Sequence, residues 1–135
     1  MPLVRIDVTA GRTEEQLRDV ADAIHDAIVE VYGIPVRDRF QIVNELPAGR
    51  IIAQDAGLGF ERTGDVVMIQ IFTQRGRTDE KKAELYDRLA NGLAGLGVAG
   101  ENVFIGYVEN GPQDWSFGFG RAQYMTGELG IPKAV

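Results

Sequence analysis

Apolar residues near the start of the chain follow first the spacing of a strand and then that of a helix. Every second residue is apolar over residues 3–8, which is typical of a strand with one buried face. The Thr-Glu-Glu-Gln sequence of residues 13–16 is a capping box and predicts the start of a helix. One face of this helix is apolar, with Leu17, Val20, Ala21, Ile24, Ile28 and Val31. Gly33 and Pro35 end the helix, and residues 40–46 form the next predicted strand.

The same order of elements recurs in the second half of the chain. Residues 66–72 form a nearly continuous apolar run, which is typical of a buried strand. A helix starts at residues 78–80, and its apolar face carries Leu85, Leu89, Leu93 and Leu96. Residues 103–108 form the last strand. Because the sequence Gly-Arg-Thr precedes each helix, at residues 11–13 and again at 76–78, we interpret the chain as two copies of one strand-helix-strand unit.

We therefore predict a single domain over residues 1–135, with internal copies at about 2–46 and 66–109 and a tail at 110–135. Strand-helix-strand units favour right-handed crossovers between parallel strands. The predicted fold class is α/β (α+β), with a four-stranded sheet that carries both helices on one face. We expect the other face to be apolar and to be covered by self-assembly. Residues 47–64 are expected to form a loop with room for a short hairpin.

Composition narrows the class of protein. No apolar run is long enough to span a membrane and the start of the chain lacks a signal-peptide pattern, so we expect a soluble cytoplasmic protein. The net charge of −6 argues against a general nucleic-acid surface. The chain has no cysteine, which excludes thiol catalysis. Its only histidine, His25, cannot build a histidine-rich metal site, and we expect it to have a structural or surface role.

Pro2 is a candidate reagent. Aminopeptidases remove an initiator Met when a small residue or proline follows, which would leave the nitrogen of Pro2 as a free secondary amine. An α-amino group titrates near ~8, so its surroundings decide whether it is a neutral base or a cationic acid. Such an amine can also form an iminium with a carbonyl compound. The predicted strand at residues 3–8 would hold it in place, whereas a free terminus usually frays. The alternative is that Pro2 is only a small second residue.

Arg75 and Arg77 lie beside Gln74 in the turn before the second helix. Arginine binds carboxylates through two parallel hydrogen bonds, and a helix N-terminus adds backbone donors, so this turn is a candidate anion site. Because the whole chain is acidic, an anionic ligand requires positive charge that is gathered locally. The alternative is that the Gly-Arg-Thr sequence only starts a helix, since Arg12 occupies the same place in the first copy.

Asp38, Trp115 and Phe117 are further candidates. Asp38 directly precedes a predicted strand and could orient or activate water. Taken alone, it is better explained by an ion pair with a neighbouring arginine or by a turn. Trp115 and Phe117 lie in a glycine-rich loop, where they could form the wall of an apolar pocket or fill a contact between subunits. No Ser-His-Asp set, P-loop or zinc-site spacing is present.

Together these features resemble the tautomerase superfamily, and in particular its malonate semialdehyde decarboxylase branch. The resemblance extends over nearly the whole chain. Besides Met-Pro at the start and the duplicated unit, it is carried by residues 37–41 (RDRFQ), 55–60 (DAGLGF), 76–78 (GRT), 114–118 (DWSFG) and 126–129 (TGEL). The chain departs from the branch in residues 74–77, which read Gln-Arg-Gly-Arg. There the decarboxylases carry either Arg-Pro-Arg or a single Arg after Gln-Ala-Gly.

The resemblance implies a homotrimer with three sites, each built around an N-terminal proline and free of any metal or organic cofactor. The implied catalytic roles fall on Pro2, Asp38, Arg77 and Arg75. The implied substrate-binding roles fall on Arg75, Arg77, Gln74, Trp115 and Phe117.

The implied activity is that of a carbon–carbon lyase, a decarboxylase of a small 3-oxo acid such as malonate semialdehyde. One alternative is a promiscuous keto-enol tautomerase, or a hydratase or dehalogenase of 3-haloacrylate-type acids. Another is a non-catalytic trimeric binding protein. In each case the expected ligand is a small anionic acid, and neither nucleic acid nor a membrane is a partner. If Met1 is retained, Pro2 is an amide and its amine chemistry is lost.

Overall fold

The computed structural model describes residues 1–133, so the last two positions of the predicted tail, 134 and 135, lie outside the described residues. Its main elements are β1 (Leu3–Thr9), α1 (Glu14–Tyr32), β2 (Phe40–Leu46), β3 (Val67–Gln74), α2 (Asp79–Ala94) and β4 (Val103–Asn110). Two short 3-10 turns, η1 (Gly100–Asn102) and η2 (Pro112–Asp114), flank β4, and α3 (Gln123–Thr126) lies in the tail. The predicted order of strands and helices is confirmed.

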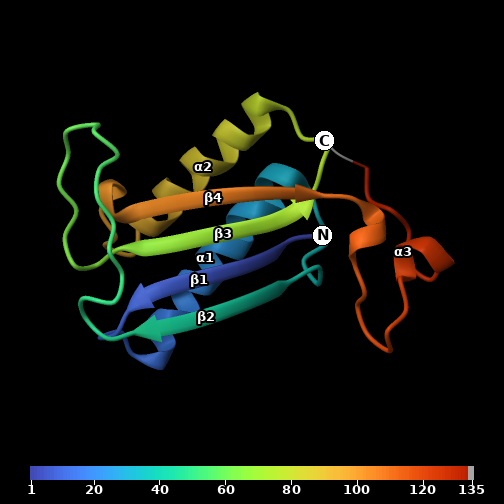
Figure 1. The fold of residues 1–135 in the computed structure, drawn as a ribbon, viewed down its shortest axis with the longest axis horizontal. Helices are drawn as coiled ribbons and strands as arrows, with labels where there is room; N and C mark the ends of the chain where they lie inside the picture. The colour runs from blue at the N-terminus through green and yellow to red at the C-terminus, as the bar shows by residue number, and fades with distance from the viewer. Residues whose placement is uncertain (134–135) are drawn as a thin grey trace.

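The four strands form one mixed sheet in the order β2-β1-β3-β4. The strands within each copy, β1 with β2 and β3 with β4, run parallel, whereas β1 and β3 pair antiparallel at the centre. Both long helices lie on the same side of the sheet, which confirms the predicted fold class (Figure 1). Because β1 and β3 are antiparallel, the start of β1 lies beside the end of β3, and Leu3 is opposite Phe72.

The hydrophobic core lies between the sheet and the two helices. Its strand residues come from alternate positions: Val4, Ile6, Val8, Val67, Ile69 and Ile71. Each helix begins at a threonine cap, where Thr13 accepts a hydrogen bond from Gln16 and Thr78 accepts one from Lys81. The capping box predicted at Thr13 is therefore present. Gly33 ends α1 in the left-handed conformation, at φ 64°.

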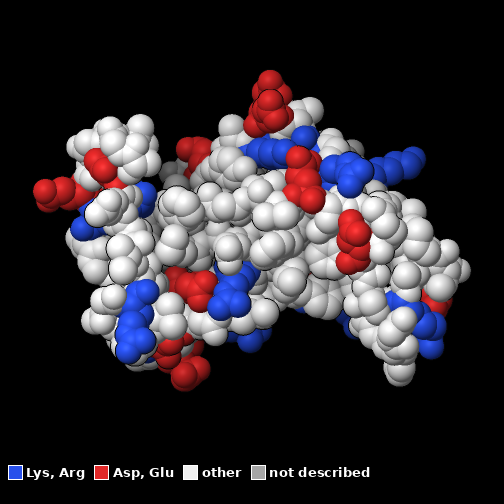
Figure 2. Space-filling model, viewed as in Figure 1, with Lys and Arg blue, Asp and Glu red and all other residues white. Residues whose placement is uncertain are grey.

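Within residues 1–133, much of the opposite face of the sheet is exposed, and this face is less uniformly apolar than predicted. Phe40, Ile42, Phe104 and Val108 are exposed on it, in the outer strands. On the central strand β1, however, Arg5 and Asp7 form an ion pair of 3.3 Å. Figure 2 shows this face as a mostly uncharged surface with charged side chains over β1. The alternation of β1 places these two side chains on the face away from the core. A second subunit that covers this face would have to accommodate their charges.

The loop between the two copies contains no hairpin. Over residues 47–66 it is held instead by polar contacts, as the carboxylate of Asp55 accepts hydrogen bonds from the backbone of Gly57 and Gly59. Arg62 donates to the Gln54 carbonyl oxygen. In Figure 1 the loop lies at the end of the sheet opposite the N-terminus. Within residues 1–133, every helix is too short or too polar to cross a bilayer.

Replacing Ile69 with Ala tests the central packing. Ile69 is fully buried and lies opposite Ile6 in the antiparallel pair. The substitution removes buried methyl groups and leaves a cavity, so it should lower the free energy of unfolding by about 2–5 kcal/mol. Chemical denaturation at fixed protein concentration measures this change. Ile52→Ala is the control, because Ile52 is 84% exposed and its loss should change stability by less than about 0.5 kcal/mol. Equal effects of the two substitutions would contradict the described core.

Candidate active site

A cavity of about 620 Å³ lies at the end of the sheet where β1 begins and β3 ends. Its apolar wall includes Tyr32, Phe40, Phe117, Tyr124 and Leu129. Its ionisable lining consists of Met1, Arg37, Asp38, Arg77 and Lys133. Three basic side chains therefore surround one carboxylate, although the whole chain carries a net charge of −6. The positive charge that an anionic ligand requires is gathered at this cavity.

The chain terminus and Asp38 form an ion pair at the cavity. The amine of Met1 lies 3.7 Å from the Oδ2 of Asp38, and both residues are buried. Burial lowers the pKa of the amine below its usual value, and the nearby Asp38 carboxylate partly offsets this effect. Burial likewise raises the pKa of Asp38, opposed by the positive amine. Pro2 is buried directly behind Met1, and its nitrogen is an amide while Met1 is present.

Arg77 is a buried cation at the same cavity, with only 5% of its surface exposed. Its Nη1 donates to the Thr73 hydroxyl and to the Gln74 carbonyl oxygen, both at 3.3 Å, and its Nε has no hydrogen-bond partner among residues 1–133. The guanidinium lies 4.4 Å from the centre of the Tyr32 ring. Within residues 1–133, no carboxylate lies within 4 Å of it. A buried charge normally requires a counter-charge, so this guanidinium is free to accept an anion.

Arg12 provides an internal comparison, because it occupies the same Gly-Arg-Thr turn in the first copy. Its Nη2 lies 2.7 Å from Asp65, so its counter-charge is supplied by the chain itself. Both turns end in a threonine that caps the following helix, Thr13 or Thr78. The helix-start interpretation therefore explains the threonines of both copies. It does not explain why Arg77 is more buried than Arg12 and yet, within residues 1–133, has no carboxylate within 4 Å of its guanidinium.

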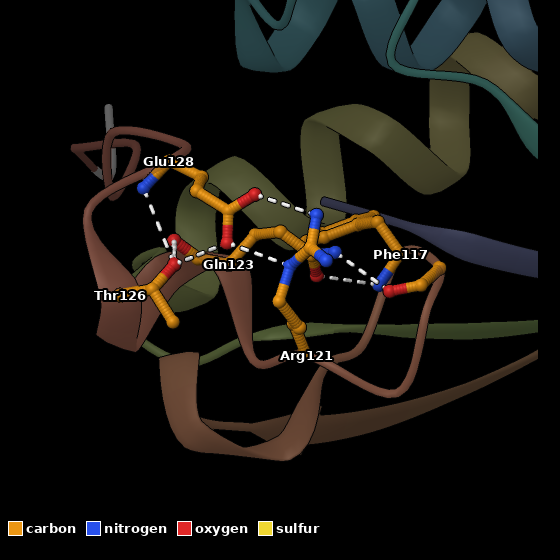
Figure 3. Close-up of polar contacts among 6 residues, drawn as sticks. Phe117, Arg121, Gln123, Thr126 and Glu128 are labelled. Atoms are coloured by element: carbon orange, nitrogen blue, oxygen red, sulfur yellow. Dashed lines mark hydrogen bonds and ion pairs between the residues drawn. The ribbon is translucent and has the colours of Figure 1, made fainter.

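Aromatic rings of the tail form one wall of the cavity. Phe117 lies edge-on to Tyr124 at 5.1 Å between ring centres, and its ring is 5.8 Å from that of Phe40. The buried side chain of Gln123 fixes this loop, because its amide oxygen accepts from the Phe117 N–H and its nitrogen donates to the Gly118 carbonyl oxygen (Figure 3). The tail thus folds back on itself and carries Phe117 to the cavity.

The structure brings some of the predicted site residues together and leaves others outside. Asp38, Arg77 and Phe117 line the cavity together with the start of the chain. The Trp115 ring stacks on Phe117 at 6.2 Å behind the wall, without lining the cavity. Arg75 is exposed and lies outside the lining.

Gln74 is buried beside the cavity. Its amide nitrogen donates to the carbonyl oxygen of Pro132 at 2.8 Å, which ties the end of β3 to the tail. Its amide oxygen has no partner within residues 1–133. Most predicted residues therefore either line the cavity or support its wall, and Arg75 does neither.

Sequence reasoning did not identify Tyr32, Tyr124 or Lys133 as cavity residues. Tyr32 is the last residue of α1, directly before the glycine that ends the helix, and the sequence predicts this helix end. The sequence does not predict the path of the tail, because the tail shows no apolar periodicity. A structural or surface role was predicted for His25, and the structure shows a structural one. Its Nε2 lies 2.7 Å from the Val36 carbonyl oxygen and anchors the loop that carries Asp38.

The chain belongs to the tautomerase enzyme family. Two profiles of that family match it, one over residues 38–118 and the other over residues 2–61. The "probable tautomerase YrdN" of Bacillus subtilis strain 168 is 42% identical over 96% of this chain and 100% of its own length. The "probable tautomerase YusQ" of the same organism is 36% identical over 93% of this chain and 99% of its own length.

Solved structures agree with this assignment and support the decarboxylase branch. The FG41 malonate semialdehyde decarboxylase inhibited by 3-bromopropiolate is 58% identical, with a TM-score of 0.93 over 96% of this chain and 99% of that one. A second malonate semialdehyde decarboxylase is 36% identical, with a TM-score of 0.88 over 94% of this chain and 98% of that one. Its structures address decarboxylase and hydratase activities.

Replacing Arg77 with Ala tests whether the cavity binds anions. Propanoate, a minimal carboxylate, should bind the wild type at least about tenfold more tightly than the variant, because a hydrogen bond to a charged group contributes about 1.5–3 kcal/mol. Isothermal titration calorimetry measures the two affinities. The Arg12→Ala variant should bind as the wild type does, since Arg12 already has Asp65 as its partner. Equal binding by the wild type and Arg77→Ala would leave Arg77 with a structural role only.

Proposed function

We propose that the protein is a cofactor-independent decarboxylase of a small 3-oxo acid such as malonate semialdehyde, with the nitrogen of Pro2 as its reactive amine. The observation that carries this proposal is the buried Arg77. Within residues 1–133, no carboxylate lies within 4 Å of its guanidinium, and it lies at one cavity with the terminal amine and Asp38. The likeness to two malonate semialdehyde decarboxylases supports the choice of reaction.

The proposed reagent requires removal of Met1. Met1 lines the cavity and only 5% of its surface is exposed, so its loss would enlarge the cavity and leave the secondary amine of Pro2 at the wall. The pairing of β1 on both sides would still hold this amine at the start of the strand, one residue from the position where the Met1 amine lies 3.7 Å from Asp38. A proline-to-alanine mutant at the first residue is among the solved forms of one related decarboxylase, which supports a terminal proline as the residue of interest.

The proposed reaction begins with the carboxylate of the 3-oxo acid on the Arg77 guanidinium. Pro2 then activates the carbonyl group: its cation donates a hydrogen bond to the carbonyl oxygen, or its neutral amine attacks the carbonyl carbon and forms an iminium as the oxygen leaves as water. The bond between the carboxylate carbon and C2 breaks, and its electron pair moves into the carbonyl or iminium group as CO₂ leaves. The resulting enol or enamine takes a proton at C2. On the iminium route, water then hydrolyses the product iminium, which releases the aldehyde and regenerates the amine of Pro2. From malonate semialdehyde, the products are CO₂ and acetaldehyde.

Asp38 and the aromatic wall assist this step in different ways. The Asp38 carboxylate raises the pKa of the Met1 amine against the effect of burial. We propose that the same negative charge favours the cation of Pro2 when Met1 is removed. Phe117 and its ring neighbours exclude water from the carboxylate, which favours departure of neutral CO₂ from an anion. Arg75 is exposed in the single chain, so we assign it no contact with the substrate.

We further propose that the protein assembles as a homotrimer through the open face of its sheet. Exposed apolar residues on β2 and β4 need a cover, and a second copy can pair the polar residues of β1. A fused 4-OT that is 25% identical to this chain, with a TM-score of 0.76, forms a symmetric trimer.

Keto-enol tautomerisation is the second candidate. Burial lowers the pKa of the Met1 amine, and the same burial at the amine of Pro2 would favour the neutral base that this reaction uses. The two tautomerase relatives from Bacillus subtilis also favour it. Parallel assays with phenylenolpyruvate, malonate semialdehyde and 3-haloacrylates separate the two candidates and also test for hydratase activity.

The role of Pro2 is tested by comparing chains that keep or lose Met1, as verified by intact mass. The chain that begins at Pro2 should decarboxylate malonate semialdehyde, and the chain that keeps Met1 should be inactive, because an amide nitrogen neither titrates nor attacks a carbonyl. Pro2→Ala, with Met1 removed, keeps a primary and more flexible amine, so its activity should fall without necessarily vanishing. Full decarboxylase activity in a chain proven to keep Met1 would exclude the proposed role.

The role of Asp38 is tested by the pH dependence of decarboxylation. Because the cationic amine is required, the rate should be lost as the pH rises through the pKa of the amine. The Asp38 carboxylate raises the pKa of the Met1 amine and should act in the same direction on the amine of Pro2, so in Asp38→Asn the loss should occur at lower pH than in the wild type. The readout is the position of this limb of the kcat/KM profile. Asp65→Asn is the control, since Asp65 pairs with Arg12. An unmoved limb in Asp38→Asn would contradict the coupling.

A further inference from the structure

The ring of Tyr32 contacts the guanidinium of Arg77. The central carbon of the guanidinium lies 4.4 Å from the ring centre, and Tyr32 is only 3% exposed. The negative charge on the face of a ring attracts a cation, and this attraction increases where water is excluded. A ring contacts the flat face of a guanidinium, whereas a carboxylate binds along its edge. Tyr32 therefore stabilises the charge of Arg77 and leaves its edge to a ligand.

The Tyr32 ring is itself held in place. It belongs to the last residue of α1, directly before the capping Gly33. Its hydroxyl donates to the hydroxyl of Tyr107 at 3.1 Å, which joins the end of α1 to β4. Tyr107 in turn packs edge-on against Tyr86 of α2. Burial raises the pKa of Tyr32, so its hydroxyl keeps the proton that it donates.

The first copy has leucine in the matching position. Tyr32 and Leu96 correspond, because each directly precedes a left-handed glycine that follows a long helix, with φ of 64° and 86°. Leu96 lines the same hollow as Arg12, just as Tyr32 lines the same cavity as Arg77. Arg12 pairs with the Asp65 carboxylate. The chain thus supplies a carboxylate to one arginine and an aromatic ring to the other.

Asp38 is a potential competitor for the guanidinium of Arg77. Both side chains line the cavity, and the Asp38 carboxylate lies 3.7 Å from the Met1 amine. Burial raises the pKa of Asp38, and positive charges oppose this effect, chiefly that of the amine and more weakly that of Arg77. Arg77 is therefore near Asp38 without forming an ion pair with it. Such a pair would occupy the edge donors that an anionic ligand needs.

We propose that Tyr32 is a positioning residue for Arg77. By holding the guanidinium against its ring, it prevents an ion pair between Arg77 and Asp38 and keeps the anion site open in the unliganded protein. This inference rests on the proposed function, in which Arg77 binds the substrate carboxylate. The role requires no contact between Tyr32 and the reacting atoms. A ring suits it because a ring offsets part of the desolvation of a buried cation without neutralising the charge.

Tyr32→Leu removes the ring and reproduces the residue of the first copy. In the chain that begins at Pro2, this variant should bind propanoate about 5- to 30-fold more weakly than the wild type, as expected for the loss of a desolvated contact between a cation and a ring. Tyr32→Phe keeps the ring and should bind within about twofold of the wild type. Isothermal titration calorimetry measures these affinities. Tyr86→Leu is the matched control, since it removes a ring beside Tyr107 outside the cavity lining.

Asp38→Asn separates positioning from a general loss of structure. It removes the competing carboxylate, so its favourable effect on propanoate binding should be at least about fivefold larger in the Tyr32→Leu background than in the wild-type background. Replacing Tyr32 with pentafluorophenylalanine keeps a ring of similar size but reverses the charge of its face. This replacement should weaken propanoate binding as Tyr32→Leu does, without leaving a cavity.

Two results would overturn this inference alone, provided that the wild type binds propanoate. One is an equal effect of Asp38→Asn in both backgrounds. The other is wild-type affinity for propanoate in the pentafluorophenylalanine variant. A wild type that does not bind propanoate would overturn the inference together with the proposed function.

Discussion

The antiparallel pairing of β1 with β3 is the contact on which the rest of this structure depends. Each copy alone is a parallel pair of strands with a helix, and it leaves one edge of its first strand open. Joining the copies through these edges closes the sheet and buries Ile6 opposite Ile69. The same pairing brings the start of β1 beside the end of β3. The two groups that define the cavity, the terminal amine and Arg77, are distant in sequence and meet only for this reason.

The two Gly-Arg-Thr turns show how one local sequence serves two different purposes. In the first copy the guanidinium of Arg12 is neutralised by Asp65, and the turn is electrically complete. In the second copy the position next to the arginine is taken by the chain terminus and Asp38, which pair with each other. Within residues 1–133, Arg77 is left without a carboxylate of its own within 4 Å, an arrangement that costs stability unless an anion binds. Functional sites commonly show such locally unfavourable arrangements.

Most of the fold was predictable from the sequence, whereas only part of the candidate site was. The alternation in β1 and the leucine spacing in α2 indicate which face of each element is buried, because residues that recur at the period of a strand or helix lie on one face. The same alternation places Arg5 and Asp7 on the open face. The prediction of an apolar face relied on the outer strands and did not take this polar pair into account. Asp38 and Arg77 were identified from local sequence and family resemblance. The position of Tyr124 at the cavity depends on how the tail folds back, which rests on single contacts such as those of Gln123.

Both ends of the described chain meet at the cavity: Met1 lines it at one side, and Pro132 and Lys133 line it at another. A fusion partner or affinity tag joined to Met1 would occupy space in or beside this cavity. One joined close after Lys133 would lie near the cavity edge. The loop of residues 47–66 lies at the opposite end of the sheet, where Ile52 and Leu58 are largely exposed. Reporter groups, immobilisation handles and inserted peptides therefore belong in that loop, where they leave the amine and its surroundings untouched.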